Sequence, residues 1–323
     1  MDRKQLLAQW LDTEFGGESF ELAIASADAS FRRYFRVFLA DRSLIAMDAP
    51  PKHEDCAPFL HVAELFRRAG VNVPRVHAHN LAQGFLLLDD LGDRIYLDAL
   101  DEGSADRLYR DAIDALVEIQ RASKGDELPE YDRALLEREL RLFPHWYIAR
   151  KLGVTLTPRQ SETLEAVFQI VLKNNLAQKR VYVHRDYHSR NLMVTDRNPG
   201  ILDFQDAVYG PITYDLVSLF KDAYIAWPEE RVLDWTIRYW EKARAAGLPV
   251  DSDFALFHRD FEWMGVQRHL KVLGIFARLY YRDGKERYLN DMPLVMRYLR
   301  AACGRYRELN PLLKLLDKLE AVH

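Results

Sequence analysis

Apolar and polar positions alternate through the first third of the chain in a pattern typical of strands. The β-rich runs cover residues 19–28, 30–40, 42–48, 73–78 and 85–88. Short turns at Ala29 and Asp41 join the first three runs, so an antiparallel meander is expected. Apolar residues recur at helical spacing across residues 56–69, and Gly70 follows as a helix terminator. The pattern predicts a small α+β lobe of five antiparallel strands around one helix.

Beyond Leu91-Gly92 the spacing of apolar residues becomes mostly helical. Ser104 can cap a helix that runs to about residue 123, and Thr157-Pro158 is a strong start for one that runs to about residue 176. Further helical patterns cover residues 228–246, 252–281 and the C-terminal segment, and one short β-rich interruption covers residues 180–204. We expect an N-terminal β-rich lobe, residues 1–91 including a hinge, and a helical C-terminal lobe, residues 92–323.

Composition restricts the class of protein and its compartment. The chain has 323 residues, of which 49% are hydrophobic and 29% charged, which is typical of a globular protein. The net charge of −4 gives no sign of a basic surface for nucleic acid. The two cysteines, Cys56 and Cys303, suggest a reducing compartment. No targeting segment and no apolar run of ~18 residues is recognisable, so we expect a cytoplasmic protein without membrane, nucleic-acid or obligate protein partners.

The β-rich interruption holds the candidate chemistry. Residues 192–194 and 200–202 flank a turn rich in Asp, Asn, Pro and Gly, which predicts a hairpin. Asn191 precedes its first strand and Asp203 follows its second. Because paired strands lie roughly 4.8 Å apart, the hairpin should bring these side chains together, with Asp186 held close by the entering loop. Two carboxylates and an amide oxygen suit Mg²⁺.

The same residues resemble a known family. The spacing His184-x-Asp186-x₄-Asn191, followed twelve residues later by Asp203-Phe204, matches the catalytic loop and metal-binding Asp of kinases. Over about residues 20–300 the chain resembles the aminoglycoside phosphotransferase and choline kinase family. Segments 27–35, 46–51 and 203–216 resemble one branch of that family, the bacterial anomeric kinases of N-acetylmuramate and N-acetylglucosamine in cell-wall recycling.

This resemblance implies a bilobal, protein-kinase-like α+β fold, with a small antiparallel β-rich N-lobe and a larger, mostly helical C-lobe. It also implies ATP as co-substrate, Mg²⁺ as cofactor and an amino sugar phosphorylated at its C1 hydroxyl. By the same resemblance, Asp186 would accept the proton of that hydroxyl, and Asn191 and Asp203 would hold Mg²⁺. The backbone of Asp89 and Leu91 would pair with adenine in the hinge.

The phosphate-binding elements depart from the usual kinase pattern. Strand-turn-strand 27–34 would lie over the phosphates, with Ser30 in a turn of small residues that lacks glycine. The third strand lacks the usual lysine, because Met47 or Asp48 occupies its position. Arg32 and Arg33 are the candidates to reach the phosphates in its place.

The acceptor pocket is predicted from chemistry. N-acetylmuramate carries a lactyl carboxylate, so a cation is expected beside it, and sugars stack on aromatic rings. The candidate substrate-binding residues are Asp206, Tyr224 and Arg268, although Asp206 is equally suited to capping the next turn. His184 and Asp215 are interpreted as structural supports of the catalytic loop.

Two other functions remain open from the sequence. The same chemistry could act on another acceptor, such as an aminoglycoside, choline, homoserine or a different sugar. The missing lysine is also compatible with a nucleotide-binding pseudokinase that regulates or scaffolds.

Overall fold

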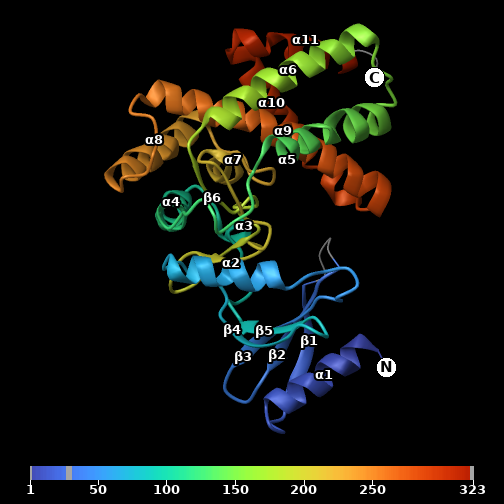
Figure 1. The fold of residues 1–323 in the computed structure, drawn as a ribbon, viewed down its shortest axis with the longest axis vertical. Coiled ribbons are helices and arrows are strands. Elements are labelled where there is room, and N and C mark those ends of the chain that lie inside the picture. Colours follow the sequence, from blue (N-terminus) through green and yellow to red (C-terminus); the bar gives the residue numbers. More distant parts are fainter. Residues whose placement is uncertain (1, 27–30, 321–323) are drawn as a thin grey trace. The chain divides into compact units, whose positions relative to one another are not determined.

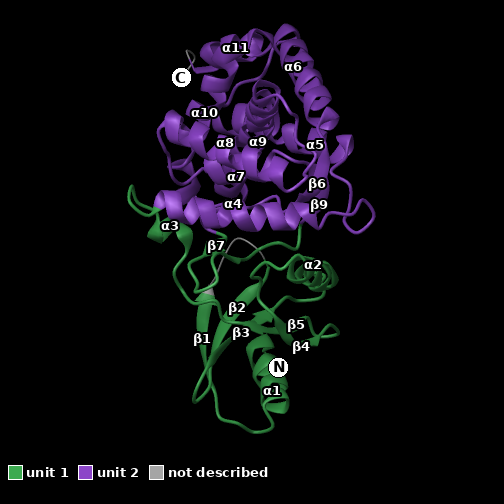
Figure 2. Ribbon diagram, turned by 90° about the vertical axis from the view of Figure 1, so that its left-hand side faces the viewer, with its two compact units in different colours: residues 1–104, 191–206 green, residues 105–190, 207–323 purple. Residues whose placement is uncertain are grey.

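The computed structural model describes residues 2–26 and 31–320. The chain divides into two compact units, coloured in Figure 2. Unit 1 contains residues 1–104 and 191–206, and unit 2 contains residues 105–190 and 207–323. Unit 1 is built on an antiparallel sheet and unit 2 is mostly helical, so the predicted fold class is confirmed. The expected lobe boundary after residue 91 stays a prediction.

The sheet of unit 1 has the order β1-β2-β3-β5-β4, and all neighbouring strands are antiparallel. Its strands are β1 (Glu21–Ser26), β2 (Arg33–Phe38), β3 (Ser43–Asp48), β4 (Val76–Asn80) and β5 (Phe85–Asp89). Each corresponds to one of the five predicted runs. The register of β2 against β3 pairs Arg33 with Asp48 and Tyr34 with Met47. The predicted strand-turn-strand 27–34 falls partly, and Ser30 wholly, outside the described residues.

Unit 1 contains helices beyond the single helix that the sequence pattern predicted. Helix α2 (Ala57–Arg68) is the expected one, but α1 (Arg3–Glu14) and the short α3 (Tyr96–Ala99) are additional. Leu7, Trp10 and Leu11 of α1 pack into a buried cluster with residues of the sheet (Figure 1). Only these three side chains of α1 are fully buried, which explains why its apolar spacing gave too weak a signal.

The predicted hairpin is present in unit 1 as β7 (Leu192–Met193) paired antiparallel with β8 (Gly200–Ile201). The Ile201 N–H donates to the Asn72 carbonyl at 2.8 Å. Phe204, just beyond the hairpin, packs on Phe59 and Phe66 of α2, with ring centroids 4.8 and 5.9 Å apart. These contacts fix the second strand of the hairpin and the residues that follow it against the rest of unit 1.

Unit 2 is assembled around its longest helix, α9 (Phe254–Asp283), most of which is buried. The remaining α-helices are α4 (Ala105–Arg121), α5 (Arg133–Leu140), α6 (Pro158–Ala177), α7 (Tyr214–Phe220), α8 (Glu229–Ala245), α10 (Met292–Arg305) and α11 (Asn310–Glu320). A π-helix, η1 (Phe143–Lys151), and two 3₁₀ helices, η2 (Glu286–Leu289) and η3 (Arg307–Leu309), complete the set. Helix α6 begins as predicted, with Thr157 and Gln160 forming a reciprocal capping box behind Pro158.

The β-rich interruption extends further than expected. Strand β6 (Arg180–Val183) pairs antiparallel with β9 (Val208–Pro211), a strand that the sequence pattern did not predict. Gly210-Pro211 resembles a turn, but Pro211 only ends the strand. Gly210 is needed for close packing, because a Cβ there would lie 2.6 Å from the Tyr131 Cβ. Among the residues described, no helix combines the length and apolar character needed to cross a membrane.

Candidate active site

The two predicted metal-binding side chains lie together in unit 1. The Asn191 amide nitrogen is 3.4 Å from Asp203 Oδ2, and the second carboxylate oxygen of Asp203 accepts a hydrogen bond from Gln205 Nε2 at 2.8 Å. The hairpin positions the pair, and the Leu202 N–H closes its base by donating to the Asn191 carbonyl at 2.9 Å. One carboxylate and one amide oxygen fit a hard cation that keeps phosphate oxygens in its shell. The described residues contain no group of three or more His, Cys, Asp or Glu suited to a metal.

The backbone at Asp203 is held in an uncommon conformation. Its φ is +60°, in the left-handed region that few residues other than glycine adopt, although aspartate tolerates it better than most. Strain of this kind persists where the surrounding structure over-determines it, typically at functional sites. Here the hairpin on one side and the packed Phe204 on the other fix the turn. The Asp203 side chain remains exposed.

The predicted hinge lies next to this hairpin within unit 1. A Cβ on Gly200 would lie 2.9 Å from the end of the Leu91 side chain, so the two segments approach closely here. The Asp89 carboxylate accepts from the Arg75 N–H at 3.0 Å and contacts His77 Nε2 at 2.6 Å, which holds the end of β5. The pairing of the Asp89 and Leu91 backbone with adenine stays a prediction.

Of the two candidates for the position of the usual kinase lysine, Asp48 lies on the face of β3 that packs against α1 and Met47 lies on the opposite face. Asp48 has no exposed side-chain surface and accepts from Arg3 Nε at 2.8 Å and Arg33 Nε at 3.0 Å. Glu64 of α2, the possible partner of such a lysine, is instead paired with Arg67 and Arg68 at the surface. Strand β3 therefore contributes the negative partner of its ion pairs, whereas the usual lysine would contribute the positive one.

Of the two arginines predicted to reach phosphate, Arg32 lies nearer to the metal-binding pair. The pKa of Tyr34 is raised by burial and by the charge of Asp203, and it is lowered by Arg32, so both charges lie near this hydroxyl. Arg32 forms an ion pair with Glu54 at 2.9 Å, whereas Arg33 is committed to Asp48. Phosphate binding by either arginine stays a prediction.

In unit 2, Asp215 is hydrogen-bonded to the loop that leads into Asp186. Its two carboxylate oxygens accept from the backbone N–H groups of His184 at 2.7 Å and Arg185 at 3.0 Å. Burial raises the pKa of Asp215 to about 7, because desolvation outweighs these two donors. The buried His184 ring accepts from the Asp186 N–H through Nδ1 at 3.3 Å. Both residues therefore act on the backbone of the loop.

Positive charge surrounds the predicted base, Asp186. Burial opposes its ionisation, but nearby cations outweigh this effect and lower the pKa of Asp186 to about 2. The neighbouring groups responsible, in order of influence, are Lys271, His188, Arg268 and Arg185. Asp186 is therefore ionised at neutral pH. It can orient a hydroxyl and receive its proton late in the reaction.

A buried ionic network supports this loop, and the sequence interpretation missed most of it. Glu139 accepts from Arg185 at 2.5 Å and from Lys271 at 2.9 Å, and it also accepts from the Tyr131 hydroxyl. Arg185 has φ +77°, a strained value for a long side chain, so the network holds an unfavourable backbone in place. Lys271 had one usable signal: it is a lysine within the buried stretch of α9, where an unpaired charge would be costly.

The predicted acceptor residues are in different surroundings. Tyr224 is half-buried beside His188, with ring centroids 5.5 Å apart. Arg268 is buried, and its Nε donates to Ser218 Oγ at 2.5 Å. Asp206 is exposed and belongs to unit 1. Contact of any of these residues with a sugar stays a prediction.

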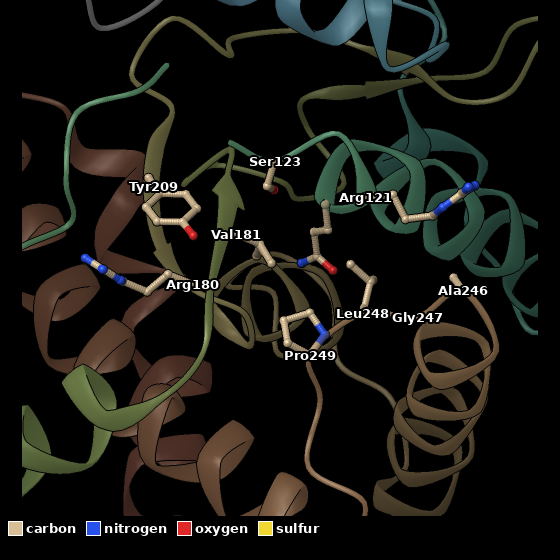
Figure 3. Close-up of a pocket in the computed structure, with 10 residues that line it drawn as sticks. Arg121, Ser123, Arg180, Val181, Tyr209, Ala246, Gly247, Leu248 and Pro249 are labelled. Carbon is tan, nitrogen blue, oxygen red and sulfur yellow. The ribbon is translucent and has the colours of Figure 1, made fainter. Parts of the chain in front are cut away.

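The cavity in Figure 3 is separate from the predicted site residues. It measures about 320 Å³ and lies within unit 2, with Tyr209 and Arg180 on one side and residues 247–249 on another. Arg180 is already paired with Glu130 and lies over the Tyr209 ring at 5.2 Å. A second cavity, between α2 and residues 73–79 of unit 1, also contains none of the predicted site residues.

The fold and these motifs define a class. A unit built on a five-stranded antiparallel sheet, with the predicted hinge and metal-binding hairpin, and a helical unit that carries the predicted Asp186 loop are the architecture of a kinase-like phosphotransferase. A sequence model of the family described as "Phosphotransferase enzyme family" (APH) matches residues 21–249. The chain belongs to that family.

Two relatives match almost the whole chain. A Pseudomonas putida protein named N-acetylmuramate/N-acetylglucosamine kinase is 51% identical, over 99% of this chain and 97% of that protein. A Neisseria meningitidis protein of the same name is 52% identical, over 99% and 96%. Among solved structures, choline kinase LicA from Streptococcus pneumoniae has a TM-score of 0.66 at 13% identity, over 92% of this chain and 99% of that one. The last similarity supports the fold alone.

Proposed function

We propose that this protein is an ATP-dependent kinase that transfers the γ-phosphoryl group to the anomeric hydroxyl of N-acetylmuramate and N-acetylglucosamine. The observation that carries the proposal is the Asp186 loop and the paired Asn191 and Asp203, in a chain about half identical to two kinases named for these sugars. The proposed physiological role is recycling of cell-wall amino sugars. A third relative, from Pseudomonas aeruginosa, has the same name and 52% identity.

In the proposed reaction the anomeric oxygen forms a bond to the γ-phosphorus, and the bond from that phosphorus to the β-phosphate oxygen breaks. The hydroxyl proton passes to the Asp186 carboxylate. Because the pKa of Asp186 is about 2, its main contribution is to orient the hydroxyl, with proton transfer late in the step. Catalysis then depends mostly on positioning and on stabilisation of charge.

The metal and nucleotide roles are part of the same proposal. Asn191 and Asp203 would hold Mg²⁺, which supplies neutralisation of the phosphate charge when bound. Leu91 and Asp89 would bind adenine through their backbone. Arg32, whose charge acts on Tyr34 together with that of Asp203, is favoured to meet phosphate over Arg33, which is paired with the buried Asp48. All of these groups lie in unit 1, on or beside the hairpin and the hinge.

The test of the acceptor is a panel assay with purified protein, Mg-ATP and each candidate acceptor, with ADP release as the readout. We expect turnover with the two amino sugars and little with choline, homoserine or an aminoglycoside. Faster turnover of choline, homoserine or an aminoglycoside would instead identify a phosphotransferase that acts on a different acceptor. Nucleotide binding without any acceptor-stimulated turnover would favour the pseudokinase.

The test of the site uses two variants. Asp186→Asn should lower kcat by on the order of 10²–10⁴-fold while leaving the Kd for ATP nearly unchanged, because a neutral amide cannot receive the proton. Asp203→Asn should raise the Mg²⁺ concentration needed for half-maximal rate, because the hairpin loses its only ligand carboxylate. Near-normal kcat in the first variant, or an unchanged Mg²⁺ requirement in the second, contradicts the assigned roles.

A further inference from the structure

We propose that Arg190 binds the carboxylate of N-acetylmuramate and so sets the preference of the enzyme between its two sugars. The inference rests on the proposed function and deepens it. The lactyl group of N-acetylmuramate is attached at C3, two ring carbons from the reacting hydroxyl. N-acetylglucosamine has a neutral hydroxyl in its place. A single well-placed cation can therefore distinguish the two acceptors.

The position of Arg190 is fixed on both its backbone and its side chain. Its guanidinium lies over the Tyr224 ring, 3.6 Å from the centroid. Asp222 ties the two segments together, since its Oδ2 accepts from the Ser189 N–H at 3.0 Å and the Ser189 hydroxyl at 2.5 Å. Its Oδ1 accepts from the Tyr224 N–H at 3.2 Å. The stacked guanidinium is thus held in place before any ligand binds, which lowers the entropy cost of binding.

Arg190 differs from Arg185 and Arg268, the other arginines around the predicted catalytic loop, in that its guanidinium donates no hydrogen bond to any of the described residues. Arg185 is paired with Glu139, and Arg268 donates to Ser218. Within the described part of the chain, no carboxylate oxygen lies within 4.0 Å of the Arg190 guanidinium. The guanidinium packs on the Tyr224 ring, and its charge acts on Asp291 from beyond that distance. Its N–H donors are therefore available, and the side chain is only half-buried.

The surroundings of Arg190 connect it to the predicted base inside unit 2. Arg190 follows Asp186 by four residues. The Tyr224 ring that carries the guanidinium also contacts the His188 ring, and the His188 N–H donates to the Asp186 carbonyl at 3.0 Å. A sugar whose hydroxyl meets Asp186 would thus have Arg190 on the side of His188 and Tyr224. This arrangement favours Arg190 over the buried Arg268 as the cation that meets the carboxylate.

Arginine is well suited to this task. Its planar guanidinium can donate two parallel N–H bonds to one carboxylate, and such charge-assisted pairs are among the stronger hydrogen bonds in proteins. Loss of a hydrogen bond to a charged group on substitution lowers affinity by on the order of 10–100-fold. Because Arg190 is partly exposed, the lower part of that range is expected.

The experiment measures kcat/KM for both sugars in wild type, Arg190→Gln, Arg190→Lys and a surface control, Arg238→Gln, all at saturating ATP. Arg238 is an exposed residue that is paired with Asp234 on α8. In Arg190→Gln, the ratio of kcat/KM for N-acetylmuramate to that for N-acetylglucosamine should fall by on the order of 10-fold or more, mostly through KM. Arg190→Lys should recover part of the ratio, since lysine keeps the positive charge but cannot donate two parallel N–H bonds to one carboxylate. Arg238→Gln should leave the ratio at its wild-type value.

Three outcomes would overturn the inference. An unchanged ratio in Arg190→Gln, or an equal loss with both sugars accompanied by a raised KM for ATP, would place Arg190 elsewhere in the reaction. If the wild-type enzyme turned over N-acetylglucosamine but not N-acetylmuramate, its substrate would have no carboxylate for Arg190 to bind. Absence of turnover with either sugar would overturn the proposed function and this inference with it. Thermal melting of each variant verifies that a loss is not due to unfolding.

Discussion

Replacing Asp48 by asparagine should destabilise unit 1 and show what anchors β3 in the absence of the usual lysine. Asp48 is fully buried and holds two arginines, Arg3 from α1 and Arg33 from β2. The Arg3 guanidinium also donates to the Gln83 carbonyl at 2.6 Å. An asparagine offers one acceptor oxygen and turns an N–H₂ group towards the other guanidinium. The substitution therefore removes both ion pairs and places an amide N–H₂ donor against one of the two guanidinium groups.

The size of the effect follows from the exposure of the three partners. Removing one member of a fully buried ion pair costs roughly 3–5 kcal/mol. Here the carboxylate has no exposed surface, but the Arg3 and Arg33 side chains are 28% and 45% exposed. Both cations can regain water after the substitution, so the cost is reduced towards that of surface pairs. We expect the free energy of unfolding of unit 1 to fall by about 2–3 kcal/mol.

Native-state hydrogen exchange is the appropriate assay, because it measures the opening free energy of β2 and β3 separately from that of α9. The control is Glu64→Gln, which breaks an exposed pair with Arg67 in the same unit and should change stability by less than about 0.5 kcal/mol. If Asp48→Asn opened no more readily than Glu64→Gln, Asp48 would not anchor the strand. A rise in the KM for ATP in Asp48→Asn alone would additionally link the anchored Arg33 to the nucleotide.

Two further predictions concern unit 2. Gly274→Ala should lower Tm, because its Cβ would lie 2.5 Å from the Leu142 carbonyl carbon and overpacking costs ~1–3 kcal/mol. Gly265→Ala has no neighbour nearer than 3.6 Å, so it should raise Tm through the higher helix propensity of alanine, a gain of up to ~1 kcal/mol. Tm shifts of the same sign in the two variants would contradict this packing. The pKa of Asp215, raised to about 7 mainly by burial, means that the folded state binds this proton more tightly than the unfolded state. The free energy of unfolding should therefore fall as pH rises from about 4 to about 7. Urea titrations should show this slope in wild type relative to Asp215→Asn, and equal slopes would refute it.

Much of the fold could be predicted because its signals are local. Alternating apolar residues gave all five strands of the sheet, and Thr157-Pro158 gave the start of α6. The hairpin required only two short apolar runs and a turn, and it brought Asn191 and Asp203 together as expected.

What could not be predicted depends on residues far apart in the chain. Asp48 pairs with Arg3, which is 45 residues away on a helix whose own pattern is weak. Glu139 and Lys271 meet from two different helices, so neither position alone indicates support for the catalytic loop. Arg190 lies inside the recognised motif, but its distinguishing feature is a ring contributed by Tyr224. Such pairings have no signature in spacing or composition.

The proposed reaction transfers phosphate to the anomeric oxygen of an N-acetylated amino sugar. The most direct measurement is ³¹P NMR of the product made from N-acetylmuramate and from N-acetylglucosamine with Mg-ATP. We predict a phosphate signal whose coupled proton is the anomeric H1, formed together with one ADP per phosphorylated sugar. A signal coupled to the C6 protons, or ADP released without any phosphorylated sugar, would contradict the account.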